Sequence, residues 1–197
     1  MLTVGEIPRH RTFISYHDGR PKFEQGGDYS FRVIFEQLFS EGSDALVCGA
    51  VQDGDIDLEI STETTRQRIR DGYLRNTSVT LVLIGARTWQ RKHVDWEIGS
   101  SIRDTPRNSR SGLLGIFLPT YPGARDSRGT LHYDPYTIPP RLYDNVECGY
   151  ATLHDWTTNP ADVRTWIHNA FIRKDRVLPV NTRPHFGRNW TSVRWMT

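Results

Sequence analysis

The sequence predicts an α/β fold built on a doubly wound parallel sheet of about five strands. Short apolar runs alternate with amphipathic, helix-like stretches along most of the chain, and this alternation is typical of parallel sheets with helices on both faces. The run from Val79 to Ile84 is rich in apolar and β-branched residues, as expected of a strand that is buried on both faces. A length of 197 residues suits one domain with additions.

Four further strands are predicted from short apolar runs. The first ends in polar residues, among them Ser15 and His17, and the fourth strand of the sheet is stopped by Pro119. The predicted runs lie at 11–16, 45–48, 113–118 and 150–153.

Helices are predicted between these strands. Asp28 or Ser30 can cap the first helix and Gly42 can end it, whereas a polar helix is expected around 62–73. The last helix opens at Asn159-Pro160, with Asn as N-cap and Pro at the first helical position. In the first helix, apolar residues recur at i, i+3, i+4, i+7 and i+8 and predict the core-facing side: Phe31, Ile34, Phe35, Leu38 and Phe39. In the last helix the residues expected to point inward are Val163, Trp166, Ile167, Ala170 and Phe171.

The helix after the third strand carries a carboxylate at an informative position. Gly85 ends the strand, and Thr88 can cap the helix. At about 100° per residue, Glu97 falls roughly 60° to one side of Val94. We therefore expect a half-buried carboxylate beside the carboxyl end of a parallel strand, where open α/β sheets bind ligands. The core-facing stripe of this helix repeats every four residues: Val94, Ile98 and Ile102.

Together these elements favour a flavodoxin-like doubly wound sheet, with two segments outside it. Residues 119–149 show no convincing periodicity and are expected to form a long loop, which in a compact domain is usually functional or mobile. The tail, 176–197, mixes arginines with aromatic residues. It can bind single-stranded nucleic acid or fold back onto the domain, and we prefer the second interpretation. Trp89 and Trp96 are either buried by neighbouring loops or form a self-association surface.

Composition narrows the class of protein. The net charge of +2 indicates no strong field toward nucleic acid or membranes. Two cysteines, Cys48 and Cys148, are too few for a disulfide framework and fit a reducing compartment. The N-terminus lacks an apolar signal core, and no stretch reaches the ~18 apolar residues of a membrane span. We therefore expect a cytoplasmic protein without a membrane partner.

Several chemistries find no support in the sequence. There is no G-x-G-x-x-G after the first strand, no phosphate-binding G-x-x-x-x-G-K-[ST] loop and no G-x-S-x-G elbow. Histidines and cysteines do not cluster at zinc spacing, so no metal site is predicted. The acidic residues from Asp53 to Glu59 alternate, but Gly54 and Thr64 stand at the wrong positions for a calcium loop of the EF-hand kind.

Two blocks of the sequence resemble TIR domains. The stretch RTFISYHD is similar to the first box of that family, and NTSVTLVLIGARTWQRKHVDWEI resembles the corresponding region of TIR-like proteins from bacterial Thoeris antiphage systems. The resemblance extends over roughly residues 11–171. It implies a TIR-like domain at 8–175, with the 119–149 loop as an insertion and 176–197 as a C-terminal basic and aromatic extension.

The resemblance also implies an activity and a site. Catalytic TIR domains consume NAD⁺ through a glutamate on the helix after the third strand of the sheet, and here that residue is Glu97. The substrate pocket of the family maps to Phe13, Ser15 and His17, with Asp53 as a tentative member. Trp89 is a further candidate substrate-binding residue, although it lies further from Glu97 than in the W-x-x-x-E step of many catalytic TIR domains, which leaves the pocket wall open.

For the whole protein, the resemblance implies a signalling enzyme in phage defence. NAD⁺ is the substrate and no other cofactor is expected. A phage-derived trigger starts the conversion of NAD⁺ into a cyclic ADP-ribose-type signal, and this diffusible nucleotide activates a separate effector. Self-association is expected, and nucleic acid is not an expected partner.

The chemistry itself is consistent with a single catalytic carboxylate. Cleavage of the nicotinamide–ribose bond expels a neutral pyridine, so the leaving group needs no general acid, unlike in ordinary glycosidases. What remains is a cationic ribose that a half-buried carboxylate can stabilise and orient. Two other functions stay open from the sequence: a non-catalytic TIR-type adaptor that acts by self-association, and a nucleotide-binding flavodoxin-like domain.

Overall fold

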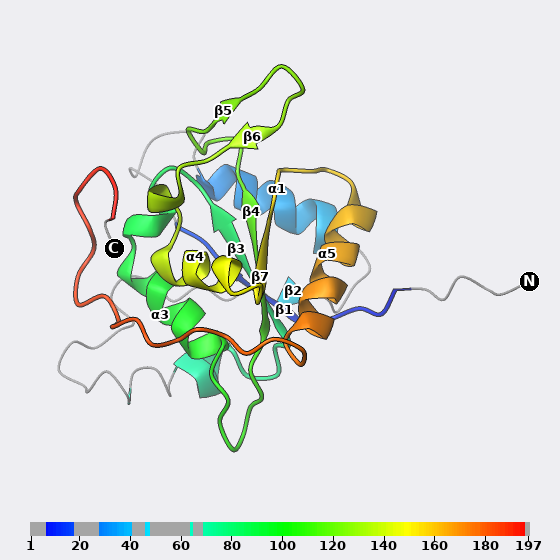
Figure 1. Cartoon of the computed structure of the whole chain (residues 1–197). Coiled ribbons are helices and arrows are strands. Elements are labelled where there is room, and N and C mark those ends of the chain that lie inside the picture. Colours follow the sequence, from blue (N-terminus) through cyan, green and yellow to red (C-terminus); the bar gives the residue numbers. More distant parts are fainter. Residues whose placement is uncertain (1–6, 18–27, 41–45, 48–63, 65–68, 196–197) are drawn as a thin grey trace, which may run out of the picture.

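A computed structural model describes the chain at residues 7–17, 28–40, 46–47, 64 and 69–195. Its centre is one sheet of five strands, all paired in parallel (Figure 1). In chain order the strands are β1 (Thr12–Ser15), β2 (Leu46–Val47), β3 (Val79–Ile84), β4 (Gly112–Phe117) and β7 (Ala151–His154). The prediction of a five-stranded, doubly wound parallel sheet is confirmed.

The order of the strands across the sheet determines where a ligand can bind. The order is β2-β1-β3-β4-β7, so the chain moves outward from β1 to β2 and then returns to the other side of β1. Such a reversal leaves a crevice at the carboxyl ends of the two central strands, here β1 and β3. The last residue of β1 is Ser15, which pairs in register with Val82 of β3.

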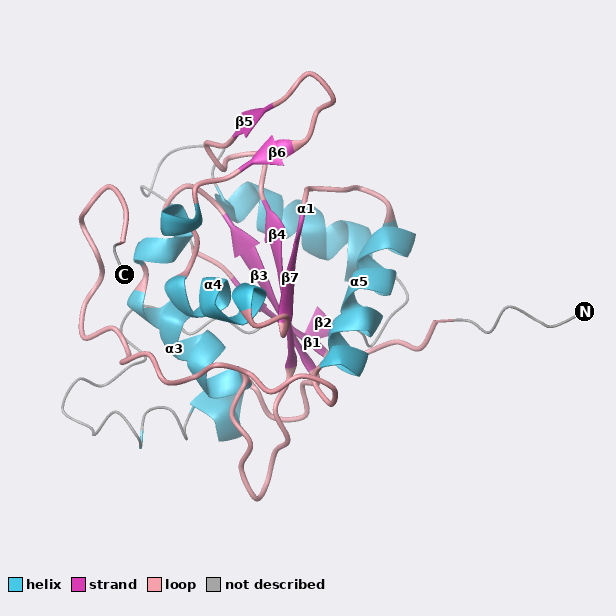
Figure 2. Ribbon diagram, in the orientation of Figure 1, coloured by secondary structure: helices cyan, strands magenta, loops and turns pink. Residues whose placement is uncertain are grey.

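Helices cover both faces of the sheet (Figure 2). Helices α1 (Asp28–Ser40) and α5 (Pro160–Arg173) pack on one face, and α3 (Lys92–Ser101) and α4 (Pro140–Glu147) pack on the other. Because side chains alternate along a strand, β3 sends Leu81 and Leu83 into the first core and Val82 and Ile84 into the second.

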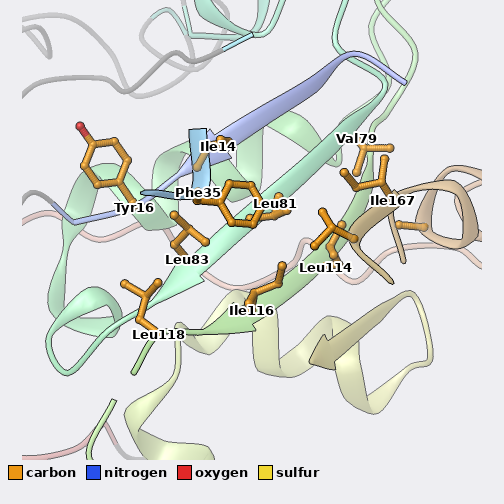
Figure 3. Close-up of a cluster of buried hydrophobic side chains, with 12 residues drawn as sticks. Ile14, Tyr16, Phe35, Val79, Leu81, Leu83, Leu114, Ile116, Leu118 and Ile167 are labelled. Carbon is orange, nitrogen blue, oxygen red and sulfur yellow. The ribbon is translucent and has the colours of Figure 1, made fainter. Parts of the chain in front are cut away.

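The first core lies under α1 and α5 (Figure 3). Phe35 of α1 is fully buried there, as predicted, whereas Ile34 and Leu38 of the predicted stripe stay exposed at 40% and 37%. The prediction for α5 holds at its start, where the Asn159 side chain accepts a hydrogen bond from the amide of Ala161 at 3.1 Å. Its predicted inward residues all contribute to this core, three of them buried and two partly buried: Val163, Ile167, Ala170, Trp166 and Phe171.

The chain between β3 and α3 differs from the prediction. Thr88 does not cap α3. It lies in a 3₁₀ turn, η2 (Thr88–Gln90), and its hydroxyl accepts a hydrogen bond from the Gly85 amide at 2.8 Å, which closes the turn after the strand. Arg91 is extended, and α3 begins only at Lys92. The predicted stripe of α3 is confirmed, since its three residues are buried in the second core: Val94, Ile98 and Ile102.

The prediction of a structureless loop at 119–149 is wrong for most of that segment. It contains an antiparallel pair, β5 (Ala124–Arg125) with β6 (Leu131–His132), then a 3₁₀ turn, η3 (Pro135–Thr137), and helix α4. Helix α4 has eight residues, about two turns. An apolar period cannot become evident in the sequence over so short a length.

The tail folds back onto the domain, the outcome preferred for it. Its residues lie along α3 and α4 (Figure 1), with Phe186 and Trp195 buried at 8% and 1% exposure. Of the predicted helix at 62–73, the structure describes residue 64, which is helical, and 69–73, which form a π-helical turn, η1 (Ile69–Tyr73), with Ile69 buried. Gly42, Cys48 and the acidic loop at 51–59 lie outside the described residues. No helix in the described part of the chain is long and apolar enough to cross a membrane.

Candidate active site

The carboxylate of Glu97 is joined to the end of the first strand. Strand β1 alternates its side chains between the two faces of the sheet, so Phe13 and Ser15 point toward α3 while Ile14 joins the core under α1 and α5. The Ser15 hydroxyl donates a hydrogen bond to Glu97 Oε2 at 2.6 Å. This distance lies in the range of charge-assisted O–H···O⁻ bonds.

The position of this pair coincides with the crevice that the strand order creates. Ser15 is the last residue of β1, and α3 follows directly on β3, the strand next to it. Glu97 and Ser15 therefore lie at the reversal point of the sheet, where doubly wound folds bind ligands. The sequence predicted this edge for Glu97, and the structure brings Ser15 to it.

Glu97 is more deeply buried than predicted. Its exposed fraction is 0%, not that of a half-buried residue. The reason is that α3 is surrounded: it contacts β1, η1 and α4, and the tail is hydrogen-bonded to it through Phe186. Next to Glu97, the Trp96 indole Nε1 donates to the carbonyl of Phe186 at 2.7 Å. A carboxylate without exposed surface can touch a substrate only after the residues that cover it have moved.

Two histidines lie near the same strand end. His17, predicted as a site residue, is half-buried, and its ring centroid is 6.2 Å from that of His93. His93 precedes Glu97 by one helical turn, is buried, and places Nε2 3.2 Å from the carbonyl oxygen of Tyr16. The sequence analysis did not single out His93, although its i, i+4 spacing from Glu97 put both residues on one side of the helix.

The other predicted site residues are placed differently. Phe13 is fully buried in a cluster with Ile69, Leu74 and Trp96, so in this conformation its ring packs against protein, and stacking on a substrate stays a prediction. Trp89 is buried at 2% exposure in η2, with its ring centroid 6.4 Å from that of Trp190. Asp53 lies outside the described residues.

The comparison with known families agrees with this geometry. A family model described as "Thoeris protein ThsB, TIR-like domain" matches residues 13–122, more than half of the chain. The chain belongs to this family. A search of curated proteins found no match. The match runs from Phe13 in β1 to beyond the end of β4 and includes both Ser15 and Glu97, so the resemblance predicted from the sequence blocks is confirmed.

A buried polar network, which the sequence analysis missed, links Asp95 inside the matched range of this TIR-like chain to residues beyond it. Asp95 of α3 is 1% exposed and accepts hydrogen bonds from Arg141 Nε at 3.0 Å and from the Phe186 amide at 3.0 Å; its Oδ2 lies 3.2 Å from His185 Nδ1. Burial alone would raise the pKa of Asp95. The His185 hydrogen bond and the Arg141 charge together outweigh this effect, so the carboxyl pKa lies below its ordinary value. No local pattern in the sequence connects residues 46 and 90 positions apart.

The network joins α3 to both α4 and the tail of the TIR-like chain. Arg141 Nη1 also donates to Asn181 Oδ1 at 2.8 Å, and Asn181 Nδ2 donates to the carbonyl of Gly99 at 2.9 Å. Removal of one partner from a buried charge pair strongly destabilises the fold, because the other charge is left buried and unpaired. The helix that carries Glu97 is therefore held from outside the matched range. Trp89 and Trp96 are both buried by neighbouring segments, which was the first of the two interpretations of these residues. In this conformation neither forms an exposed self-association surface.

Proposed function

We propose that this TIR-like chain is an enzyme that cleaves the nicotinamide–ribose bond of NAD⁺ and forms a cyclic ADP-ribose-type signal for a separate effector. NAD⁺ is the substrate, and the reaction needs no additional cofactor. The observation that carries the proposal is the buried carboxylate of Glu97, held by the Ser15 hydroxyl at the reversal point of the sheet. Membership of the Thoeris family supports a role in antiphage defence.

The proposed reaction needs a negative charge beside the ribose and does not need a general acid at the leaving group. Nicotinamide leaves as a neutral molecule, and positive charge develops on the ribose as the bond breaks. A carboxylate in a site shielded from water stabilises this charge more strongly than one in solvent. Because Ser15 fixes Glu97 Oε2, the carboxylate is oriented before the substrate arrives, and no reorganisation is needed during the reaction.

Cyclisation additionally requires that water stay out while the adenine end folds back onto the ribose. The β5–β6 hairpin follows the carboxyl end of β4 and projects from that edge of the sheet (Figure 1). It is pinned to the end of β7 by an ion pair between Arg125 and Asp155. We propose that this hairpin, or a second copy of the chain, closes the site during cyclisation.

Full burial of Glu97 supports an enzyme that is inactive until a trigger opens the site. An opening that costs about 2.7 kcal/mol leaves roughly one molecule in a hundred competent. We propose that a phage-derived factor shifts this equilibrium, since only a ligand with a preference for the open state can do so.

The decisive experiment is incubation of the purified protein with NAD⁺, with and without lysate of phage-infected cells, followed by mass spectrometry of the products. We expect nicotinamide and a cyclic product of ADP-ribose mass less one water, with more turnover in infected lysate. Glu97→Gln keeps the size of the side chain and removes its charge, so turnover by this variant should fall at least 100-fold. Wild-type rates in Glu97→Gln, or no NAD⁺ loss by the wild type in either condition, would contradict the proposal.

A further inference from the structure

The tail lines an open hollow beside α3. Residues 183–192 curve outward as an arch (Figure 1, red) and line a space of about 520 Å³. Sites for small organic ligands typically measure about 300–1,000 Å³. The hollow is distinct from the Glu97 site, because its lining comes from the tail alone.

The lining combines positive charge with aromatic rings. It contains no Asp or Glu, and its polar and aromatic members include Arg183, His185, Phe186, Arg188 and Trp190. Arg183 is already neutralised, since its Nε and Nη2 each donate to the Asp144 carboxylate at 2.8 Å. Arg188 is exposed and forms no ion pair with any residue in the described part of the chain. It is therefore the cation that an anionic ligand would meet.

Trp190 provides a rigid, partly exposed platform. Its backbone amide donates to the carbonyl of Gln90 at 2.8 Å, and its ring packs at 6.4 Å from Trp89 and 5.5 Å from Phe186, measured between centroids. Yet 38% of the residue remains exposed. An aromatic ring that is fixed before binding loses little entropy when a second ring stacks on it.

We propose that this hollow binds a free nucleotide, with the base on Trp190 and the phosphates on Arg188. Base–aromatic stacking tolerates any base, while a guanidinium pairs with two phosphate oxygens at once. A single nucleotide suits the site better than a nucleic-acid strand, because the lining is confined to ten consecutive residues, and strand binding needs a continuous basic groove.

Occupancy of the hollow would act on the helix that carries Glu97. The arch is joined to α3 by several contacts: Asn189 Oδ1 accepts from the Lys92 amide at 2.8 Å, the Phe186 carbonyl accepts from Trp96, the Phe186 amide donates to Asp95, and His185 Nδ1 lies 3.2 Å from Asp95 Oδ2. The first satisfies an amide at the start of the helix, which would otherwise lack a partner. A ligand that prefers one position of the arch therefore shifts α3 with it. This effect on turnover rests on the proposed function; binding itself does not.

The test is calorimetric titration of the full chain with ADP, which has no nicotinamide–ribose bond and so cannot be consumed by the proposed reaction. We expect saturable binding, at least tenfold weaker in Arg188→Ala and in Trp190→Ala. Val193→Ala serves as the control, because Val193 is 88% exposed and does not line the hollow. Adenosine and inorganic phosphate should each bind at least tenfold more weakly than ADP. Trp190→Phe, which keeps a ring, should restore most of the affinity and so separates stacking from a folding defect.

Hydrogen exchange of 92–101 provides the second readout. ADP should change the exchange rate of this helix at least twofold, and Arg188→Ala should abolish the change. Three outcomes would each overturn the proposal: no ADP binding at millimolar concentration, wild-type affinity for ADP in Arg188→Ala and Trp190→Ala, or binding of an oligothymidylate but not of ADP. ADP binding with these mutational effects supports the site even where wild-type protein cleaves no NAD⁺, an outcome that would refute only the proposed function.

Discussion

The hydroxyl of Ser15 does two things at once: it ends a strand and it positions a carboxylate. Its bond to Glu97 Oε2 is 2.6 Å long and fully buried, and a buried hydrogen bond to a charged group is worth about 1.5–3 kcal/mol. If that energy is used in the transition state, Ser15→Ala should lower kcat for NAD⁺ cleavage by roughly 10- to 100-fold. Steady-state measurement of nicotinamide release tests this.

Ser100→Ala is the matched control for that variant. Ser100 is also a buried serine, on the same helix, but its hydroxyl has no hydrogen-bond partner among the described residues. Its removal should leave kcat within about twofold of the wild type. Equal losses in the two variants would mean that Ser15 only supports the packing of α3.

At the same scale, His154 makes stability depend on pH. Its ring stacks on Trp166 at 4.2 Å, and Nε2 lies 3.0 Å from the Thr152 hydroxyl. Burial, aided by the charge of Arg173, lowers the His154 pKa from 6.5 to about 4. Above pH 6.5 the histidine is neutral in both the folded and the unfolded chain. Between pH 6.5 and about 4, the unfolded chain binds a proton at this histidine and the folded chain does not. The free energy of unfolding therefore decreases as the pH is lowered through this window.

Urea unfolding at pH 7.5 and pH 4.5 measures this effect. The wild type should lose more unfolding free energy between these two values than His154→Gln, which has no titrating ring. Burial also lowers the pKa of His10, but that contribution is common to both proteins and cancels in the difference. Identical losses would show that His154 keeps an ordinary pKa.

At the scale of the elements, prediction succeeded wherever the signal was local. Helix α5 has fourteen residues, an Asn N-cap and a continuous apolar stripe, and all three features are readable from neighbouring residues. The strand β3 was equally clear, because both of its faces are buried. Helix α4 escaped prediction since two turns are too short for a period, and the depth of Glu97 escaped it because α3 is covered by a distant part of the chain.

Helix α3 and the tail approach so closely that only glycine fits between them. A Cβ built on Gly99 would lie 2.3 Å from His185 Cε1 and 3.1 Å from Arg141 Nε. Gly99→Ala should therefore push the tail away from the helix and destabilise the fold by about 1–3 kcal/mol, as overpacking does. Gly187→Ala, in the same tail, meets no atom within 4 Å and should change stability little. Thermal unfolding of both variants, with hydrogen exchange of residues 181–192, distinguishes them; equal stability would contradict this packing.

At the scale of the whole molecule, the contacts that complete the site join segments that no sequence pattern relates. The Asp95 network links α3 to α4 and to the tail, and the family match ends at residue 122, before either partner. The sequence pattern and the family resemblance thus located Glu97 and the strand that precedes its helix. The burial of Glu97 and the support of its helix depend on tertiary contacts alone. We infer that the tail is part of the folded unit that holds Glu97.

Trp195 tests this inference, because it anchors the far end of the tail. It is 1% exposed, its indole Nε1 donates to the Ile138 carbonyl at 2.7 Å, and the Arg183 guanidinium lies 4.9 Å from its ring centroid. Truncation of a buried aromatic residue costs about 3–5 kcal/mol when the fold is cooperative. Trp195→Ala should lower the unfolding free energy by that amount, while Val193→Ala, two residues away and 88% exposed, should lower it by less than about 0.5 kcal/mol.

Circular dichroism in urea measures the global transition, and hydrogen exchange of 92–101 measures the helix that carries Glu97. If the tail belongs to the same cooperative unit, Trp195→Ala weakens both by the same free energy. A tail that merely rests on the surface would instead detach alone, and the main transition and the exchange of α3 would stay as in the wild type. Only the first result is compatible with a tail that supports the Glu97 helix, since a segment that unfolds independently contributes no free energy to the position of its neighbour.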